Sequence, residues 1–196
     1  MVVAEVVAGA ADVVVPRGRH KKMDLWHPAY IGVGSNLDDP RAQLLRAFAR
    51  LTELPKTRLV LTSPLYVSQP FGPVRQPEFV NAVVGVLTQL DPLTLLRSLQ
   101  DLETAQGRPG PEQRERWGPR VIDLDVLVYG RERRADGELT LPHPGIVERN
   151  FVLYPLADIA PDLEIPGLGR VIELKGRVTS AGIGRLELKR TAHENT

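Results

Sequence analysis

The stretch Val121–Tyr129 constrains the fold more than any other part of the chain. Its apolar and polar residues alternate as in a β-strand, where successive side chains point to opposite faces. One face is expected to be wholly apolar and to comprise Ile122, Leu124, Val126 and Val128. Asp123 and Asp125 then share the other face, about 7 Å apart along the strand. Because aspartate is depleted in strands, this pair needs a physical reason.

Two readings of the aspartate pair are open. The first is a solvated outer face with two harmless acids, which is the commoner meaning of an isolated Asp-x-Asp. The second is a metal site, because two carboxylates on one face repel each other unless a cation lies between them. Oxygen ligands at this spacing suit Mg²⁺, which takes one or two carboxylates together with substrate phosphates.

Composition removes several classes of protein. The 196 residues suit one domain, and the absence of cysteine excludes disulfides and thiolate metal sites. A formal net charge of +1 argues against a strongly basic nucleic-acid-binding protein. No apolar run approaches the ~20 residues of a membrane helix. The acidic residues Glu5 and Asp12 interrupt the Ala/Val-rich start, whose basic residues follow it, so we expect no export signal and a cytoplasmic protein.

Hydrophobic spacing predicts an α+β fold. Strands are expected at 29–33, at 60–67 with an edge or bulge at Pro64, at 79–87 and at 121–129. Helices are expected after an N-cap at Asp38, after the cap Asp91-Pro92 as far as Gly107, and around 148–159. This order indicates a ferredoxin-like sandwich, a mainly antiparallel sheet with helices packed on it.

The same patterns divide the chain into three parts. Residues 1–27 are expected to be an N-terminal tail, because residues 1–22 show no periodic apolar face and end in clustered basic residues. Residues 28–166 are expected to form the folded domain. The Gly-rich, charged segment 167–196 is expected to be a separate C-terminal segment.

Arginines lie just upstream of the aspartate pair. Arg116-Trp117-Gly118-Pro119-Arg120 precedes it directly, and Arg108 and Arg114 stand earlier in a polar loop. Guanidinium groups beside metal-binding acids suit polyphosphate chemistry, although some of these arginines are equally explained as loop solubilisers. The chain has neither Gly-Lys-Ser/Thr nor the dinucleotide glycine pattern, so phosphates would be held by side chains and metal.

Two further groups of residues suggest a ligand site. Phe71, Phe79 and Asn81 lie in and after a proline-rich loop, and a flat heterocycle binds by stacking on aromatic rings and pairing with an amide. Phe79 on a strand is also a usual core residue. His143 lies between two prolines, with Arg149 and Phe151 following, and a single histidine there is more often structural than catalytic.

Together these stretches resemble the 6-hydroxymethyl-7,8-dihydropterin pyrophosphokinase family. The resemblance runs from about Ala29 to Leu163. Its motifs are Tyr30-Ile31-Gly32-Val33-Gly34-Ser35-Asn36-Leu37, Gln69-Pro70-Phe71-Gly72-Pro73 with Phe79-Val80-Asn81-Ala82, Arg116-Trp117-Gly118-Pro119-Arg120-Val121-Ile122-Asp123-Leu124-Asp125, and Pro142-His143 with Arg149-Asn150-Phe151-Val152-Leu153. The stretch from Arg116 to Asp125 is the most specific of them.

The resemblance implies a ferredoxin-like enzyme of folate biosynthesis that transfers pyrophosphate from ATP to a pterin hydroxymethyl group and releases AMP. It implies two Mg²⁺ ions held by Asp123 and Asp125, with Arg108 and Arg120 assisting transfer. The ATP-binding positions it implies are Gln100, Glu103, Arg108, Trp117, Arg120, Thr140, His143 and Arg149. The pterin-binding positions it implies are Pro70, Phe71, Gly72, Phe79, Asn81, Trp117 and Phe151. Pterin and ATP are then the partners, with no nucleic acid, membrane or obligate protein partner, and the length leaves no room for a second fused enzyme.

Two other functions are alternatives to this one. An RNA-binding ferredoxin-like module would carry exposed aromatic residues on its sheet, whereas Asp123 and Asp125 would repel phosphate in the absence of metal. A metal-dependent phosphohydrolase could use the same aspartates and would consume ATP without a pterin acceptor. Identifying AMP as the product distinguishes the three.

Overall fold

The computed structural model describes residues 25–70, 72, 75–110, 112 and 118–187. Within these ranges six strands form one sheet, with two small two-stranded sheets beside it. The strands are β1 (His27–Ser35), β2 (Thr57–Thr62), β3 (Tyr66–Ser68), β4 (Phe79–Thr88), β5 (Asp123–Tyr129), β6 (Arg134–Ala135), β7 (Thr140–Leu141), β8 (Glu164–Ile165), β9 (Gly169–Arg170) and β10 (Ile183–Arg185). The helices are α1 (Pro40–Glu53), α2 (Pro92–Ala105), α3 (Asn150–Ile159) and α4 (Val171–Lys175), with a 3₁₀ turn at Ile146–Glu148.

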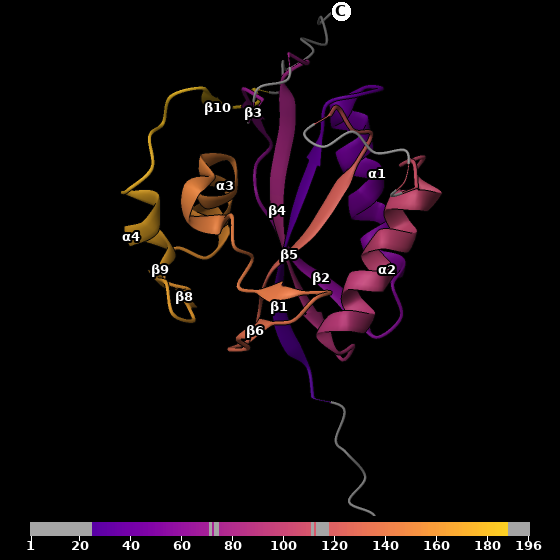
Figure 1. The fold of residues 1–196 in the computed structure, drawn as a ribbon, viewed down its shortest axis with the longest axis vertical. Coiled ribbons are helices and arrows are strands. Elements are labelled where there is room, and N and C mark those ends of the chain that lie inside the picture. The colour runs from indigo at the N-terminus through magenta and orange to yellow at the C-terminus, as the bar shows by residue number, and fades with distance from the viewer. Residues whose placement is uncertain (1–24, 71, 73–74, 111, 113–117, 188–196) are drawn as a thin grey trace, which may run out of the picture.

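The main sheet has the expected antiparallel ferredoxin-like arrangement. Its strand order is β10-β3-β4-β1-β5. β2 also pairs with β4, along the same edge as β3 but at the other end of the strand. Every strand pair in it is antiparallel. Helices α1 and α2 cover one face, while α3 and α4 lie on the other (Figure 1). The prediction of helices packed on a mainly antiparallel sheet is confirmed.

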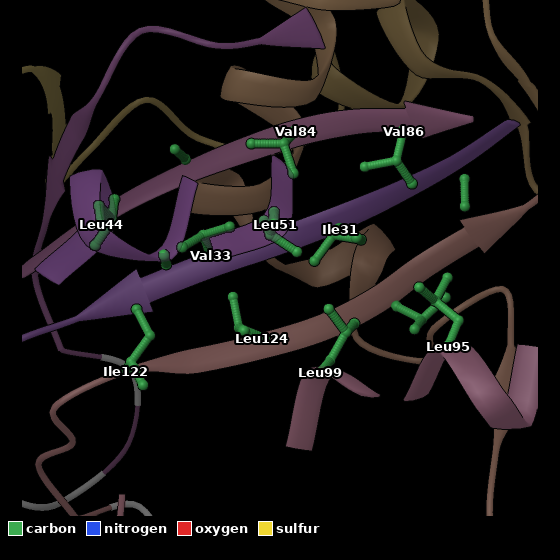
Figure 2. Packing of buried hydrophobic residues seen from close by; sticks show 14 of the residues in the cluster. Ile31, Val33, Leu44, Leu51, Val84, Val86, Leu95, Leu99, Ile122 and Leu124 are labelled. Carbon is green, nitrogen blue, oxygen red and sulfur yellow. The ribbon is translucent and has the colours of Figure 1, made fainter. Parts of the chain in front are cut away.

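The face covered by α1 and α2 is a closed apolar core. Leu44 and Leu51 of α1 and Leu95 and Leu99 of α2 are fully buried against the central strands (Figure 2). Burying a leucine side chain contributes about 1.5–3 kcal/mol to folding, so these helices are held chiefly by packing. The second core, between the sheet and α3 and α4, is a separate cluster that includes Leu127, Leu153 and Leu156.

The alternation expected along β5 holds only up to Val126. Ile122, Leu124 and Val126 belong to the core under α1 and α2. Val128, predicted to lie with them, belongs with Leu127 to the core on the α3 face. The β1–β5 register shifts between Tyr30 and Ile31, opposite these residues. An extra residue in one strand reverses the alternation beyond it, which explains why that prediction was wrong.

The strand predicted at 60–67 is two strands. β2 ends at Thr62 and β3 begins at Tyr66, with Pro64 between them. Because proline has no N–H to donate, it interrupts a ladder. Ser63 keeps the segment on the sheet, since its N–H donates to the Val83 carbonyl at 2.9 Å and its hydroxyl accepts from the Val83 N–H at 3.0 Å.

Both long helices begin with an aspartate followed by proline. Asp91 caps α2 as predicted, its carboxylate accepting from the Leu93 and Thr94 N–H groups. In α1 the cap is Asp39, which accepts from the Ala42 N–H, rather than the predicted Asp38. Asp39 precedes Pro40, the first helical residue, and its position directly before the N1 proline makes it the cap.

The structure gives the C-terminal segment more order than its sequence suggests. α4 packs on α3, and β10 adds a strand to the β3 edge of the main sheet. At the other end, β1 begins at His27, the last residue of the predicted tail. Within the described part of the chain, no helix is both long and apolar enough to cross a membrane.

Candidate active site

Three neighbouring strands bring several of the predicted ligand residues onto one face of the sheet. Gly34 of β1 lies opposite Asn81 of β4 on one side and Asp123 of β5 on the other. Gly32, two residues earlier, lies opposite Asp125. Directly paired residues share a face of the sheet. The glycines therefore leave an open strip between the amide and the carboxylates, and a Cβ on Gly34 would come within 3.1 Å of the Asn81 Oδ1.

A cavity lies over this strip on the α3 face of the sheet. It is walled by β3 and the loop after it, by the segment before β5, and by the start of α3. Its lining comprises Gly32, Val33, Gly34, Ser68, Gln69, Gln76, Phe79, Asn81, Ala82, Arg120, Asp123, Asp125, Arg149, Phe151 and Val152. The cavity thus combines two aromatic rings, three side-chain amides, two carboxylates and two guanidinium groups.

Asp123 lies between two arginines. Its Oδ1 is 2.6 Å from the Arg108 Nη1, and its Oδ2 accepts from the Arg120 Nη1 at 2.6 Å. The three side chains are between 13% and 27% exposed, so these ion pairs are shielded more than ordinary surface pairs. Both arginines predicted to contact phosphate are therefore at the carboxylate in the ligand-free chain.

Glu103 of α2 contacts this cluster through Arg108 and the backbone of β5. Its side chain is 2% exposed, and its Oε1 accepts from the Leu124 N–H at 2.6 Å and from the Arg108 guanidinium. Burial raises the pKa of Glu103, and the charge of Arg108 works in the opposite direction. In this structure Glu103 fixes the start of β5 and the position of Arg108, and it does not line the cavity.

Asp125 has a different environment from Asp123. Its Oδ2 is 4.0 Å from both the His143 Nε2 and the Arg149 Nη1, beyond hydrogen-bonding distance. Burial, and then repulsion from Asp123, raise the pKa of Asp125 to about 7. Both effects disfavour the charged form of Asp125, and a nearby cation would counteract them.

His143 presents one ring nitrogen to Asp125. Its Nδ1 accepts from the Gly145 N–H at 3.0 Å, so in the neutral ring the proton is on Nε2, the atom nearest Asp125. Burial, and then the charge of Arg149, lower the pKa of His143 to about 4. The ring is therefore neutral at physiological pH, with its N–H at Nε2.

Arg149 and Phe151 are positioned by the start of α3. The Arg149 guanidinium carbon lies 5.8 Å from the Phe151 ring centroid, within cation–π range. It also packs against Gly145, where a Cβ would approach the guanidinium carbon to 2.8 Å. A larger residue at 145 would therefore force the Arg149 side chain to shift.

Asn81 and Phe79 occupy the β4 side of the cavity. Asn81 is 6% exposed and its Nδ2 donates to the Ser68 Oγ at 2.9 Å. This bond fixes the orientation of the amide relative to β3. The carboxamide is thus buried and aligned beside the aromatic residue, as a pocket for a flat heterocycle needs.

Asn36 is a site residue to which the sequence reasoning gave no role. Its Nδ2 donates to the Gln76 Oε1 at 3.0 Å and to the Pro77 carbonyl at 3.1 Å, while its Oδ1 accepts from the Arg120 N–H at 2.8 Å. It connects the loop before β4 to the backbone of Arg120. The signal available in the sequence was a polar residue directly after a buried strand.

Not every predicted residue lies at the cavity. Gln100 is exposed on α2, and Pro70 and Gly72 are not among the lining residues. Thr140 lines a second groove, between the β6–β7 hairpin and residues 166–168, which His143 also borders. Phe71 and Trp117 lie outside the described residues, as do Arg114 and Arg116.

Comparison with known proteins identifies one family. Residues 30–161 match the model of the 7,8-dihydro-6-hydroxymethylpterin-pyrophosphokinase (HPPK) family. The 2-amino-4-hydroxy-6-hydroxymethyldihydropteridine pyrophosphokinase of Pseudomonas aeruginosa is 47% identical over 80% of this chain and 95% of its own length. The Haemophilus influenzae protein of the same name is 46% identical over 74% of this chain and 89% of its own.

The fold has solved counterparts. The crystal structure of wild-type Plasmodium falciparum HPPK-DHPS with pteroate aligns with a TM-score of 0.62 at 16% identity, over 78% of this chain and 42% of that one. The present chain therefore spans less than half of that protein, and the likeness concerns the fold. Given the family match and the identities, this chain belongs to the 7,8-dihydro-6-hydroxymethylpterin-pyrophosphokinase family.

Proposed function

We propose that this cavity transfers pyrophosphate from ATP to the hydroxymethyl group of 6-hydroxymethyl-7,8-dihydropterin, giving the pterin diphosphate and AMP. The chain is an ATP-dependent pyrophosphokinase by family. The observation that carries the proposal is the strand register, which sets the Asn81 amide and the Asp123 carboxylate on either side of Gly34. A pterin bound at the amide would hold its hydroxymethyl group near the carboxylates.

The pterin is bound by the β4 side of the cavity and the start of α3. The Asn81 carboxamide offers a donor and an acceptor side by side to the edge of the heterocycle. Phe79 and Phe151 provide faces for stacking, and both line the cavity. Gly32 and Gly34 line the cavity without side chains, and a pterin ring would lie against the strip that they form.

The two carboxylates present fit Mg²⁺, and we propose two ions, as the family resemblance implies. No group of three or more His, Asp or Glu side chains among the described residues forms a metal cage. Mg²⁺ is usually held by one or two carboxylates plus substrate phosphates, which is what Asp123 and Asp125 would provide. The raised pKa of Asp125 also fits, because burial and the charge of Asp123 both disfavour its anion until a cation is near. When bound, Mg²⁺ neutralises charge on the triphosphate and aligns it for in-line transfer.

The chain's own cations complete the phosphate site. Arg108 and Arg120 reach Asp123 in the ligand-free chain, so their guanidinium groups are already where the phosphates would arrive. Arg149 and the His143 Nε2–H border Asp125 and would donate to further phosphate oxygens. Fixed donors of this kind stabilise charge that develops on a transferred group.

The test is a product assay on the purified chain. We expect that incubation with ATP, Mg²⁺ and the dihydropterin yields AMP in equal amount to the pterin diphosphate, and no AMP when the pterin is omitted. ADP as product, or ATP consumption that ignores the pterin, would instead support the phosphohydrolase. Omitting Mg²⁺ should abolish the transfer.

A further inference from the structure

The C-terminal strap (residues 179–185) lies beyond the residues that match the family model, yet it touches two walls of the cavity. On one side, β10 pairs with β3, with Ile183 opposite Ser68 and Arg185 opposite Tyr66. The pairing continues past both ends of the strand: the Gln69 N–H donates to the Gly182 carbonyl at 2.8 Å, and the Leu186 N–H donates to the Leu65 carbonyl at 2.8 Å. The strap thus fixes the backbone of the wall to which Ser68 and Gln69 belong.

On the other side, the strap is bound to the first residue of α3. The Asn150 Nδ2 donates to the Thr179 carbonyl at 3.0 Å and to the Ala181 carbonyl at 3.1 Å. Asn150 lies between Arg149 and Phe151, which both line the cavity. A single amide nitrogen therefore uses both of its hydrogens to hold the α3 wall to the strap.

Polar contacts, rather than burial, attach the strap. Gly184 and Arg185 are exposed and Ile183 is only half-buried. Farther along α3, Asp158 accepts from the Tyr66 hydroxyl at 2.6 Å and from the Arg185 Nη2 at 2.7 Å. Because the strap contributes little apolar burial, its polar contacts can be altered without removing a core.

We propose that Asn150 and the C-terminal strap are positioning elements of the pterin pocket, which hold the β3 wall and the α3 wall at a fixed separation. Ser68 orients the Asn81 amide, and Phe151 is adjacent to Asn150 in the chain. Loosening the strap moves the hydrogen-bonding residue and the stacking residue apart. Of the proposed phosphate-binding residues, only Arg149 lies beside Asn150. Arg108 and Arg120 are held at Asp123 of β5, away from the strap, so we expect nucleotide binding to depend on the strap less than pterin binding does.

Three variants of the full chain test this inference, which rests on the proposed function. Asn150→Asp keeps the size but directs a carboxylate oxygen at two carbonyl groups. Gly182→Ala adds a Cβ 3.0 Å from the Gln69 Cγ at a residue with φ of 69°, and so perturbs the strap from the β3 side. Gly184→Ala is the matched control in the same strap, since nothing lies within 4 Å of its added Cβ.

Titration of 6-hydroxymethyl-7,8-dihydropterin, with a non-hydrolysable ATP analogue and Mg²⁺ present, gives the pterin Kd. A separate titration gives the analogue Kd. We expect Asn150→Asp and Gly182→Ala each to weaken pterin binding by about fivefold or more while nucleotide binding stays within about twofold, and Gly184→Ala to change neither. Failure of the unmodified chain to bind the pterin would contradict the proposed function, whereas the difference between variants and unmodified chain tests the strap alone.

Two results would overturn the proposal. One is an unchanged pterin Kd in a folded variant in which only the melting temperature falls, because the strap would then be merely stabilising. The other is an equal weakening of pterin and nucleotide binding, which indicates a general loss of structure. If Asn150→Asp does not fold, Gly182→Ala against Gly184→Ala decides alone.

Discussion

The two faces of the main sheet differ in what their side chains contact: one packs against helices, and the other borders a polar cavity. Under α1 and α2 the strands present mainly apolar side chains, which pack with the leucines of the two helices in one buried cluster (Figure 2). On the α3 face, the end of the sheet near Gly34 presents an amide and two carboxylates beside glycines. One face is closed by packing and contributes stability. The other face holds two carboxylates that repel each other and a strip of glycines, and it is suited to bind ligands.

The contrast is visible within a single strand. Leu124 is 3% exposed in the closed core, while its neighbours Asp123 and Asp125 face the cavity. The backbone between the two aspartates is also held from the closed face, because the Leu124 N–H donates to the buried Glu103 carboxylate. Rigid packing on one face is what gives the carboxylates on the other a fixed position.

The largest expected effect is on the closed face. Leu51 of α1 is fully buried, so Leu51→Ala removes apolar contacts and leaves a cavity. We expect it to reduce the free energy of unfolding by about 2–5 kcal/mol. Urea denaturation measures the loss. The kcat of the remaining folded enzyme should be unchanged at a temperature well below its melting point, and a large drop in kcat would break the division of labour between the faces.

On the open face the expectation is reversed. Asp123→Asn or Asp125→Asn removes a hard anionic ligand while keeping the size of the side chain. We expect kcat to fall by at least about a hundredfold, about 2.7 kcal/mol of transition-state stabilisation. Steady-state AMP formation measures it, and denaturation should show no loss of stability in Asp125→Asn. Near-normal turnover in Asp125→Asn would falsify the two-carboxylate metal site.

The features that could be predicted are those that depend on short stretches of sequence. The element order and the aspartate pair on one face were predictable, because each depends on alternation or capping within a few residues. The bulge at Leu127 was not, since the run Val126-Leu127-Val128 is apolar throughout and hides the change of phase. The alternation becomes ambiguous wherever both faces of a strand are buried.

The contacts that the sequence did not reveal are long-range and polar. Glu103 binds a backbone N–H 21 positions away, and Asn36 connects two loops that lie 40 or more positions from it. Strap residues are few, partly glycine and little buried, so they carry no periodicity. Such contacts depend on the finished tertiary structure and leave no pattern in the chain.

A smaller effect is expected at the open strip. Gly34→Ala places a Cβ 3.1 Å from the Asn81 Oδ1, which must shift the amide that would pair with the pterin. We expect the pterin Kd to rise by about tenfold, ~1.4 kcal/mol, with little change in melting temperature. Gly137→Ala is the control, because nothing lies within 4 Å of its Cβ. Equal binding by the two variants would mean that the strip is not part of the pterin pocket.

The smallest effect is on the pH dependence of stability without ligands. Burial and the charge of Asp123 raise the pKa of Asp125 to about 7, whereas an unfolded aspartate has a pKa near 3.9. The folded chain therefore holds this proton more tightly, and the stabilisation it provides is present at low pH and is lost as the pH rises from about 4 to about 7. His143 acts in the opposite sense, because its lowered pKa of about 4 makes the folded state less stable as the pH falls below 6.5.

The two contributions overlap, so a difference measurement is needed to separate them. We expect the unfolding free energy of Asp125→Asn, minus that of the unmodified chain, to become more favourable to the variant from pH 4 to pH 7 and to level off above. The histidine contribution is present in both proteins and cancels to the extent that removing the Asp125 charge leaves the His143 pKa in place. Urea denaturation at a series of pH values without Mg²⁺ or nucleotide measures the difference. Adding Mg²⁺ with an ATP analogue should cancel much of the variant's advantage at pH 7, because the cation stabilises the carboxylate that the asparagine lacks. A difference that stays constant across this range would show that Asp125 titrates like an exposed carboxyl, and that the open face holds no destabilised charge for a cation to relieve.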